Sequence, residues 1–442
     1  MAYKLIVPPE KVLETVGKHM LIEGFKIIPD LAKSKGTYLY DAISGREILD
    51  MFGFFATLAL GHNDPAYHED EEFLRNLQIA AITNPSNSDF YTQQMATFLE
   101  TLERIALPEG FKYLFFISGG ALAVENALKV AMDWKVQKNF KKGYKTERGH
   151  QVMHFKQAFH GRSGYTLSLT NTTPEKTQYF AKFNWPRITN PKITFPLEDH
   201  LEEVEQLEKQ AIEEMKKAFY ENKDDICAII IEPIQGEGGD NHFRPEFFQV
   251  LRELADENEA LLIFDEVQTG VAATGQFWAH QHFGVSPDII AFGKKMQVCG
   301  IMVTERVDEV PENVFHVKGR INSTWGGSLV DMVRATKILQ VIEERGLVEH
   351  NARIGQKIMS VLQELAQQFP LSNIRGRGTF IAFDLPSTEI RNKVIEVALE
   401  EGALLLQSGT KSIRFRPPLT ISEEDVNVLH SILISTFKKV FR

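Results

Sequence analysis

The sequence has little cysteine: Cys227 and Cys299 are the only two among 442 residues. Two cysteines cannot form the disulfide framework of a small secreted protein, and they suit a reducing compartment, so we expect a cytoplasmic protein. The sequence also lacks a run of about 20 apolar residues, the length that a membrane-spanning helix needs. Its first residues lack the apolar core of a signal peptide, so we expect neither a membrane span nor a secretion signal.

A positive net charge and a metal-ligand spacing are missing as well. The chain carries 49 lysine and arginine residues against 59 acidic residues, a formal net charge of −10. That balance disfavours nucleic acid or an anionic membrane as the main partner. The 13 histidines show no HExxH-like spacing, and we therefore expect no metal site.

What the sequence does contain is an alternation of short apolar runs with longer segments of helical periodicity, between about residues 61 and 330. The strand candidates are "YLFFIS", "HQVMHF", "CAIIIEPI", "ALLIFDEV", "DIIAFG" and "GIMVT". Nearly continuous hydrophobic runs are typical of parallel strands that helices cover on both faces. The pattern predicts an α/β fold with a mostly parallel sheet in a large domain, 61–330. A smaller α+β domain is expected at 331–442, joined by the N-terminal segment 1–60.

Three of these strand ends carry groups that could do chemistry. A glycine-rich turn with Gly120 and Ala121 opens a helix, where backbone N–H groups and the helix dipole favour an anion. Asp265 follows a buried run directly, and such a carboxylate is costly unless it is paired. The run "DIIAFGKK" ends in two lysines, and a desolvated lysine becomes a nucleophile because its pKa falls. Taken singly, each feature also has a plain structural reading: a turn, an ion pair, a solvated lysine.

Together the three features predict a pyridoxal phosphate site. The phosphate would lie on the helix N-terminus, Asp265 would face the pyridinium nitrogen, and a lysine would form the Schiff base. Adjacent side chains of a strand point to opposite faces, so Lys294 and Lys295 should not both reach the cofactor. The local sequence does not choose between them.

The motifs extend to most of the chain, from about Asp30 onward, and the chain resembles the class III (ω-type) aminotransferases of fold type I. The motifs that carry the resemblance are "SGGALAVENALK", "AFHGRSGYTLSLTN", "EPIQGEGG", "FDEVQTG", "AFGKK", "NSTWGG" and "IRFRPPLT". Other stretches, such as "NPSNSD" and "GKKMQVCG", are most similar to the bacterial L-lysine 6-aminotransferases within that family. The resemblance implies a seven-stranded sheet in the large domain.

The resemblance also implies roles for single residues. Lys294 would be the Schiff-base lysine, since the family's lysine lies at the matching distance after the aspartate. Phe159 would stack on the pyridine ring, and Gln268 would lie near its phenolic oxygen. Gly120 and Ala121 would hold the phosphate through backbone amides. Thr324 would reach the cofactor phosphate of a partner subunit, which implies a homodimer with shared active sites, and Asn322 beside it would contact substrate.

The implied reaction moves the ε-amino group of L-lysine to 2-oxoglutarate, giving 2-aminoadipate 6-semialdehyde, which cyclises to piperideine carboxylate, and L-glutamate. Arg162 would hold the distal carboxylate of either substrate, and Arg414 the α-carboxylate of 2-oxoglutarate. Glu237 would pair with Arg414 when lysine is bound and swing away for the keto acid, helped by its glycine neighbours. Arg416 is expected in a structural ion pair or at the surface.

Two alternatives stay open at this point. The first keeps the fold and cofactor but takes ornithine, 4-aminobutyrate or a diamine as the donor. The second is a non-catalytic protein that binds pyridoxal phosphate; the presence of both Asp265 and Lys294 argues against it.

Overall fold

A seven-stranded sheet forms the centre of the molecule. The structure, a computed structural model, describes residues 3–441. The order of the strands across the sheet is β3 (Phe111–Ile117), β9 (Cys299–Thr304), β8 (Ile289–Phe292), β7 (Leu261–Asp265), β6 (Ile226–Ile231), β4 (Gln151–Phe155) and β5 (Arg187–Ile188). Only β9 runs against its neighbours, because the β8–β9 and β3–β9 pairs are antiparallel and the other pairs are parallel. The predicted mostly parallel, seven-stranded sheet is confirmed.

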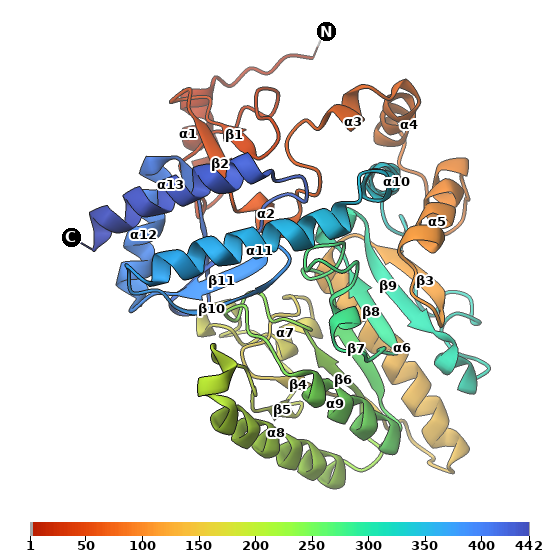
Figure 1. Ribbon diagram of the computed structural model, residues 1–442. Coiled ribbons are helices and arrows are strands. Elements are labelled where there is room, and N and C mark those ends of the chain that lie inside the picture. Colours follow the sequence, from red (N-terminus) through yellow and green to blue (C-terminus); the bar gives the residue numbers. More distant parts are fainter. Residues whose placement is uncertain (1–2, 442) are drawn as a thin grey trace.

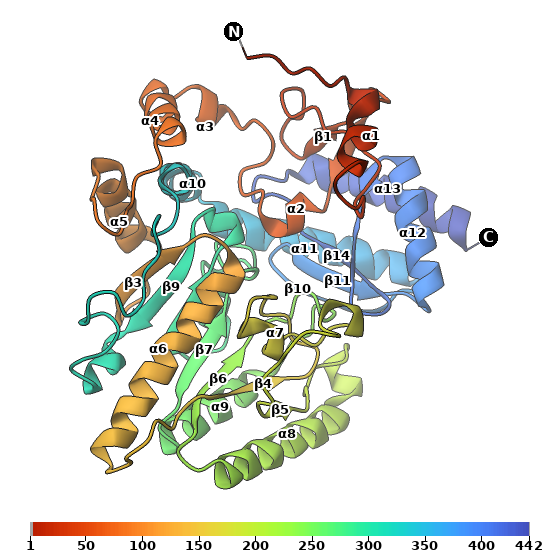
Figure 2. The same ribbon diagram turned by 180° about the vertical axis from the view of Figure 1, so that it is seen from behind.

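Helices cover both faces of this sheet, as the apolar strand runs require. Helix α6 (Gly120–Lys141) lies on the face turned to the viewer in Figure 2, and α8 (Leu201–Glu221) and α9 (Pro245–Glu257) lie on the other face, which is turned to the viewer in Figure 1. All residues of β6, β7 and β8 are buried as a result. The α/β class predicted from the sequence is confirmed. Strand β5, with only two residues, was too short for the sequence to reveal.

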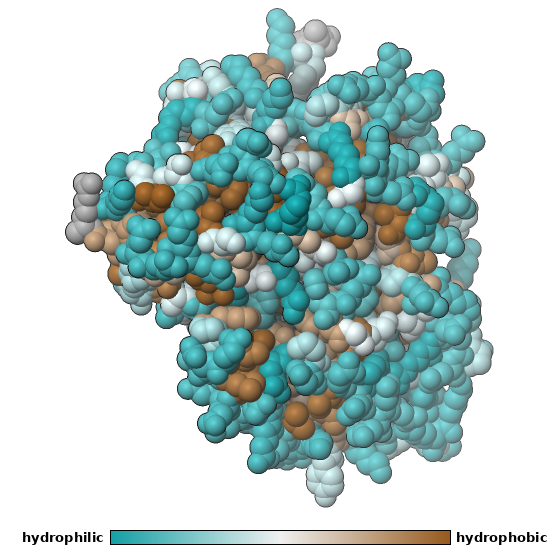
Figure 3. All heavy atoms as spheres, in the orientation of Figure 1, coloured by the Kyte–Doolittle hydropathy of each residue, from teal (hydrophilic) through white to brown (hydrophobic). Residues whose placement is uncertain are grey.

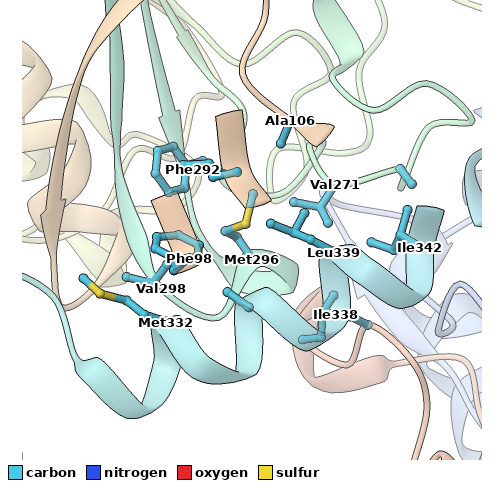
Figure 4. Packing of buried hydrophobic residues seen from close by; sticks show 14 of the residues in the cluster. Phe98, Ala106, Val271, Phe292, Met296, Val298, Met332, Ile338, Leu339 and Ile342 are labelled. Carbon is cyan, nitrogen blue, oxygen red and sulfur yellow. The ribbon is translucent and has the colours of Figure 1, made fainter. Parts of the chain in front are cut away.

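Beyond β3 and β9 three further helices pack together. They are α4 (Glu71–Ile82), α5 (Gln93–Ile105) and α10 (Leu329–Glu344). Their apolar faces share one buried cluster with the end of β8, where Phe292, Met296 and Leu339 meet (Figure 4). Met296 directly follows the two adjacent lysines, so its burial anchors the chain that carries them.

The rest of the chain builds two smaller sheets. Four antiparallel strands form one, in the order β10 (Ser372–Arg377), β11 (Phe380–Asp384), β14 (Ser412–Phe415), β13 (Leu406–Ser408). Helices α11 (Leu347–Ala366), α12 (Thr388–Glu401) and α13 (Glu423–Val440) enclose a second core with it. The other sheet joins the two ends of the chain: β1 (Tyr38–Tyr40) pairs with β2 (Glu47–Asp50), and β2 pairs in parallel with β12 (Ala403–Leu404).

The remaining helices are short: α1 (Val12–Gly17), α2 (Gly53–Ala56), α3 (Pro65–His68) and α7 (Thr166–Leu169). The division of the chain at residues 60 and 330 stays a prediction, and its second boundary falls at the start of α10. Hydrophobic side chains form separate patches on the mostly hydrophilic face that Figure 3 draws. Within residues 3–441 no helix has the length and apolar character needed to span a membrane.

Candidate active site

A cavity of about 530 Å³ opens at the carboxyl ends of the central strands. In open α/β sheets the loops that leave these strand ends meet at one edge and form the ligand site. Most of the predicted site residues line this cavity, although they come from distant parts of the sequence. They are Gly120, Ala121, Phe159, Arg162, Glu237, Asp265, Gln268 and Lys294.

The first wall of the cavity is the N-terminus of α6. The chain leaves β3, turns at Gly119 with a φ of 106°, and enters the helix at Gly120. A positive φ of this size favours glycine at the turn. The first turn of α6 leaves backbone N–H groups without helical partners, and such groups can donate hydrogen bonds to a bound anion.

The carboxylate of Asp265 is buried at the end of β7, and it is paired, as a buried carboxylate must be. Its Oδ2 atom accepts a hydrogen bond of 2.8 Å from Nδ1 of His160, and its Oδ1 atom accepts one of 3.1 Å from the backbone N–H of Val267. The sequence analysis missed His160. The only signal was its place in "AFHGR", directly after the phenylalanine expected to stack on the cofactor.

The two lysines do not lie in a strand, so the strand-alternation argument about them was wrong. They form a 3₁₀ turn, Lys294–Met296, after β8, and Lys294 has a left-handed φ of 50°. Lys294 lines the cavity, whereas Nζ of Lys295 is buried and donates to the carbonyl of Ala56 at 3.2 Å. The turn therefore separates the two side chains and brings only Lys294 to the cavity.

Burial changes the protonation of both lysines. Desolvation, aided by Arg414, lowers the pKa of Lys294 below its ordinary value, so a neutral amine is easier to reach at this position. Desolvation and the nearby Arg416 lower the pKa of Lys295 to about 7. Because both pKa values fall, protonation does not distinguish the two lysines; their positions do.

Glu237 lines the cavity and pairs with two cations, Arg414 and Lys176, which do not belong to the cavity lining among the described residues. Nη2 of Arg414 donates to its Oε2 atom at 2.8 Å, and Nζ of Lys176 pairs with its Oε1 atom. Burial opposes ionisation, but Arg414 and Lys176 together hold the pKa of Glu237 below its ordinary value. The sequence analysis missed Lys176, which lies in a surface loop with no motif of its own.

Arg416 forms a buried ion pair, and the alternative that it lies at the surface was wrong. Its Nη2 atom is 2.6 Å from Oδ1 of Asp240, and its Nε donates to Oε1 of Gln268 at 2.9 Å. Burial lowers the pKa of Arg416 to about 10, although Asp240 opposes the shift. Arg416 thus orients Gln268, which also accepts a weak bond of 3.4 Å from Arg414.

The glycines that flank Glu237 have a reason other than mobility. A Cβ atom on Gly236 would lie 2.6 Å from Oε1 of Gln268, and one on Gly238 would lie 2.0 Å from the carbonyl oxygen of Gln157. The backbone carbonyl of Glu237 itself accepts a hydrogen bond of 3.1 Å from Gly409. The packing therefore argues against the expectation that these glycines loosen the segment: the backbone is closely packed and anchored, and movement of Glu237 would fall to its side chain.

Glu232 is a further buried carboxylate at the cavity that the sequence analysis passed over. Its two oxygens accept the backbone N–H groups of Phe159 and Gly236, at 2.9 and 3.0 Å. Burial raises its pKa to about 7. The signal was present, since Glu232 follows the apolar strand β6 directly, as Asp265 ends β7. Glu232 fixes the backbone of two segments that line the cavity.

The last three predicted residues differ in position. Arg162 is exposed at the rim of the cavity. Asn322 and Thr324 are exposed as well, and they do not belong to the cavity lining within the described residues. The backbone of their segment is held by two hydrogen bonds: Asn87 donates to the carbonyl of Trp325 and Ser88 to that of Ser323, both at 2.8 Å.

The residues at the cavity fit pyridoxal phosphate. They supply a helix N-terminus for the phosphate, a buried carboxylate for the ring nitrogen, and a desolvated amine for the aldehyde. A group of three or more His, Cys, Asp or Glu side chains placed to hold a metal ion is absent from the described part of the chain.

The fold and the cavity define a pyridoxal phosphate-dependent transferase of fold type I. More narrowly, the chain belongs to the class III aminotransferases, because the family model "Aminotransferase class-III" matches residues 23–437. It is therefore an aminotransferase that uses pyridoxal phosphate.

Three relatives refine this comparison. The L-lysine-epsilon aminotransferase of Mycobacterium tuberculosis is 51% identical over 421 residues, covering 95% of this chain and 93% of the relative. The protein of the same name from Streptomyces clavuligerus is 46% identical and covers 98% and 95%. A solved structure of the M. tuberculosis lysine aminotransferase in the internal aldimine form matches with a TM-score of 0.96 at 50% identity, covering 98% of this chain and all of the other.

Proposed function

We propose that this protein transfers the ε-amino group of L-lysine to 2-oxoglutarate, giving 2-aminoadipate 6-semialdehyde, which cyclises to piperideine carboxylate, and L-glutamate. The observation that carries the proposal is the ion pair between Glu237 and Arg414 at the cavity. The relatives named as L-lysine-epsilon aminotransferases, similar over nearly the whole chain, support the choice of donor.

The two substrates place opposite demands on one site. Lysine reacting at its ε-amine has no carboxylate on the reacting carbon, whereas 2-oxoglutarate has one there. The guanidinium of Arg414 is almost fully buried, and a buried cation without a counter-charge is expensive. When lysine is bound, Glu237 supplies the counter-charge of Arg414. When 2-oxoglutarate is bound, its α-carboxylate replaces Glu237 as the partner of Arg414. Arg162, at the rim, binds the distal carboxylate of either substrate.

The other residues act on the cofactor and the reacting carbon. When bound, pyridoxal phosphate supplies an electrophilic carbon and an electron-withdrawing ring. Gly120 and Ala121 would hold the phosphate by backbone N–H groups, Phe159 would pack on the ring, and Gln268 would lie at its phenolic oxygen. Asp265 would hold a proton on the ring nitrogen. Lys294 takes a proton from the amine-bearing carbon and returns one, which its lowered pKa favours.

A homodimer with shared active sites completes the proposal. Asn322 and Thr324 point to it, since they are exposed on a segment whose backbone is held by two hydrogen bonds. In the dimer each would complete the partner subunit's site, Thr324 at the cofactor phosphate and Asn322 at the substrate. A cytoplasmic location suits Cys227 and Cys299, which are both free.

The decisive experiment offers one amine donor at a time to the purified protein with pyridoxal phosphate and 2-oxoglutarate. The donors are L-lysine, L-ornithine, 4-aminobutyrate and a diamine, and the readouts are glutamate and the mass of the carbonyl product. Turnover of lysine to the 6-semialdehyde or its cyclic imine supports the proposal. Turnover of another donor with lysine inert would overturn the donor and the role of Glu237, but not the class of enzyme.

A further inference from the structure

Lys176 is the second cation on Glu237, and no motif of the sequence marks it. It ends a 3₁₀ turn, Pro174–Lys176, in a largely exposed loop. Its Nζ pairs with Oε1 of Glu237 and donates to Oγ1 of Thr172 at 3.2 Å. The same atom lies 5.5 Å from the ring centre of Phe159. Lys176 is thus held beside Glu237 and Phe159, two residues of the cavity lining, by three separate contacts.

The two oxygens of Glu237 are divided between its two partners. Oε2 takes the hydrogen bond from Arg414, and Oε1 takes Lys176. A turn of the carboxylate that releases Arg414 therefore does not have to release Lys176. The packed glycines and the bond from Gly409 keep the backbone of Glu237 in place, so the carboxylate moves only as far as its own side-chain torsions allow.

This division matters when a keto acid enters. Its α-carboxylate pairs with Arg414 in place of Glu237. Glu237 would then be an ionised carboxylate without that partner, on a side chain that is only 30% exposed to water. An unpaired carboxylate there is costly. A cation that stays with Glu237 during the exchange removes most of that cost.

We propose that Lys176 is a positioning residue for the exchange of substrates: it keeps Glu237 paired while a substrate α-carboxylate occupies Arg414. The inference rests on the proposed function, since it assumes that the site alternates between an amine donor without that carboxylate and a keto acid with it. Lys176 favours the keto-acid state over the lysine state, because Glu237 keeps Arg414 as a partner when lysine is bound and depends on Lys176 when the keto acid is bound.

The test compares Lys176→Met with the wild type in two separate half-reactions, lysine with the pyridoxal phosphate form of the enzyme and 2-oxoglutarate with the pyridoxamine phosphate form, each followed by the cofactor absorbance. Loss of a charged hydrogen bond of this kind corresponds to roughly a tenfold or larger change. We expect kcat/KM for 2-oxoglutarate to fall by about that factor, and kcat/KM for lysine to stay within about twofold. Binding of glutarate, a dicarboxylate without a reacting carbonyl, should weaken in parallel.

Two further variants sharpen the comparison. Lys176→Arg keeps the cation and should restore most of the 2-oxoglutarate activity. Lys182→Met is the matched control, because Lys182 lies six residues on in the same loop and donates only to the carbonyls of Thr177 and Phe180. It should leave both half-reactions unchanged.

A double-mutant cycle with Glu237→Gln separates the pairing from any general effect of the loop. With a neutral side chain at position 237, Lys176→Met should no longer weaken the 2-oxoglutarate half-reaction. Equal loss in both half-reactions, no loss in either, or an undiminished loss in the Glu237→Gln background would each overturn the role of Lys176. Failure of the wild type to use lysine would instead overturn the proposed donor, so the two failures are distinguishable.

Discussion

His160 and Asp265 form one buried unit although 105 positions separate them: Nδ1 of the imidazole lies 2.8 Å from Oδ2 of the carboxylate. In this pair Nδ1 is the donor and the carboxylate oxygen is the acceptor. The imidazole thereby fixes the direction of Asp265, and its own Nε2 atom is buried with no hydrogen-bond partner among the described residues. This arrangement would keep Asp265 aimed at the ring nitrogen of the cofactor in the role proposed for it.

Replacing His160 should therefore destabilise the protein itself. His160→Leu keeps a similar volume and removes the donor, which leaves Oδ2 of Asp265 buried and unpaired. We expect the free energy of unfolding, measured by urea titration, to fall by about 1–3 kcal/mol. The exposed His19, changed to leucine, is the control and should shift it by less than about 0.5 kcal/mol. An unchanged stability in His160→Leu would show that the bond contributes nothing.

The two adjacent lysines should differ sharply in activity. Lys294→Ala removes the amine proposed to move the proton, and kcat should fall by about 10²- to 10⁴-fold or more. Lys295→Met replaces a buried lysine by an apolar side chain of similar length, outside the cavity lining. Steady-state turnover of that variant should stay far closer to the wild type. Comparable losses in the two variants would contradict the assignment of Lys294.

Lys295 should also give the stability a pH dependence. Its pKa is about 7 in the folded protein and about 10.4 in an unfolded chain. Between those values the unfolded chain binds more protons, so the free energy of unfolding rises with pH, by at most about 1.4 kcal/mol per pH unit from this group.

Lys295→Met removes this contribution, so the difference in unfolding free energy, wild type minus variant, should increase from pH 7 to pH 9. Urea titrations of both proteins at the two pH values measure it. Titratable groups that do not interact with Lys295 contribute equally in both proteins and cancel in the difference. A difference that does not change with pH would mean that Lys295 keeps an ordinary pKa.

Glu237→Ala should harm the two half-reactions unequally. With lysine bound, the variant leaves Arg414 buried without its counter-charge, and kcat/KM for lysine should drop about tenfold or more. With 2-oxoglutarate or glutamate bound, the substrate carboxylate pairs with Arg414, so the loss should be several times smaller. Single-turnover measurements of each half-reaction decide the matter, and equal losses would count against the exchange.

The sequence predicted what depends on neighbours along the chain. The apolar runs of β6, β7 and β8 are buried over their whole length, so their composition alone marks them. Asp265 and the pair Lys294 and Lys295 stand out in the same way, since charged groups come at the end of an apolar run, but only the family resemblance selected Lys294.

What the sequence could not predict depends on contacts between distant segments. Lys176 is an ordinary loop lysine until folding sets it against Glu237, 61 positions later. In the sequence the glycines beside Glu237 suggested a flexible backbone. The structure shows instead that the carbonyl of Gln157 and the side chain of Gln268 leave no room for a larger side chain at these positions. The 3₁₀ turn at Lys294 likewise follows from the anchor of Met296 in a core that α5 and α10 complete.

The parallel pairing of β2 with β12 joins two strands that are synthesised at very different times in the nascent chain. Leu49 lies opposite Ala403, so β2 emerges from the ribosome 403 − 49 = 354 residues before its partner. At about 5–20 residues per second this is a wait of roughly 20–70 s. For that time one edge of β2 is open to foreign strands. The first pieces of the fold to be made are among the last to be completed, and a chain released early would carry that open edge permanently.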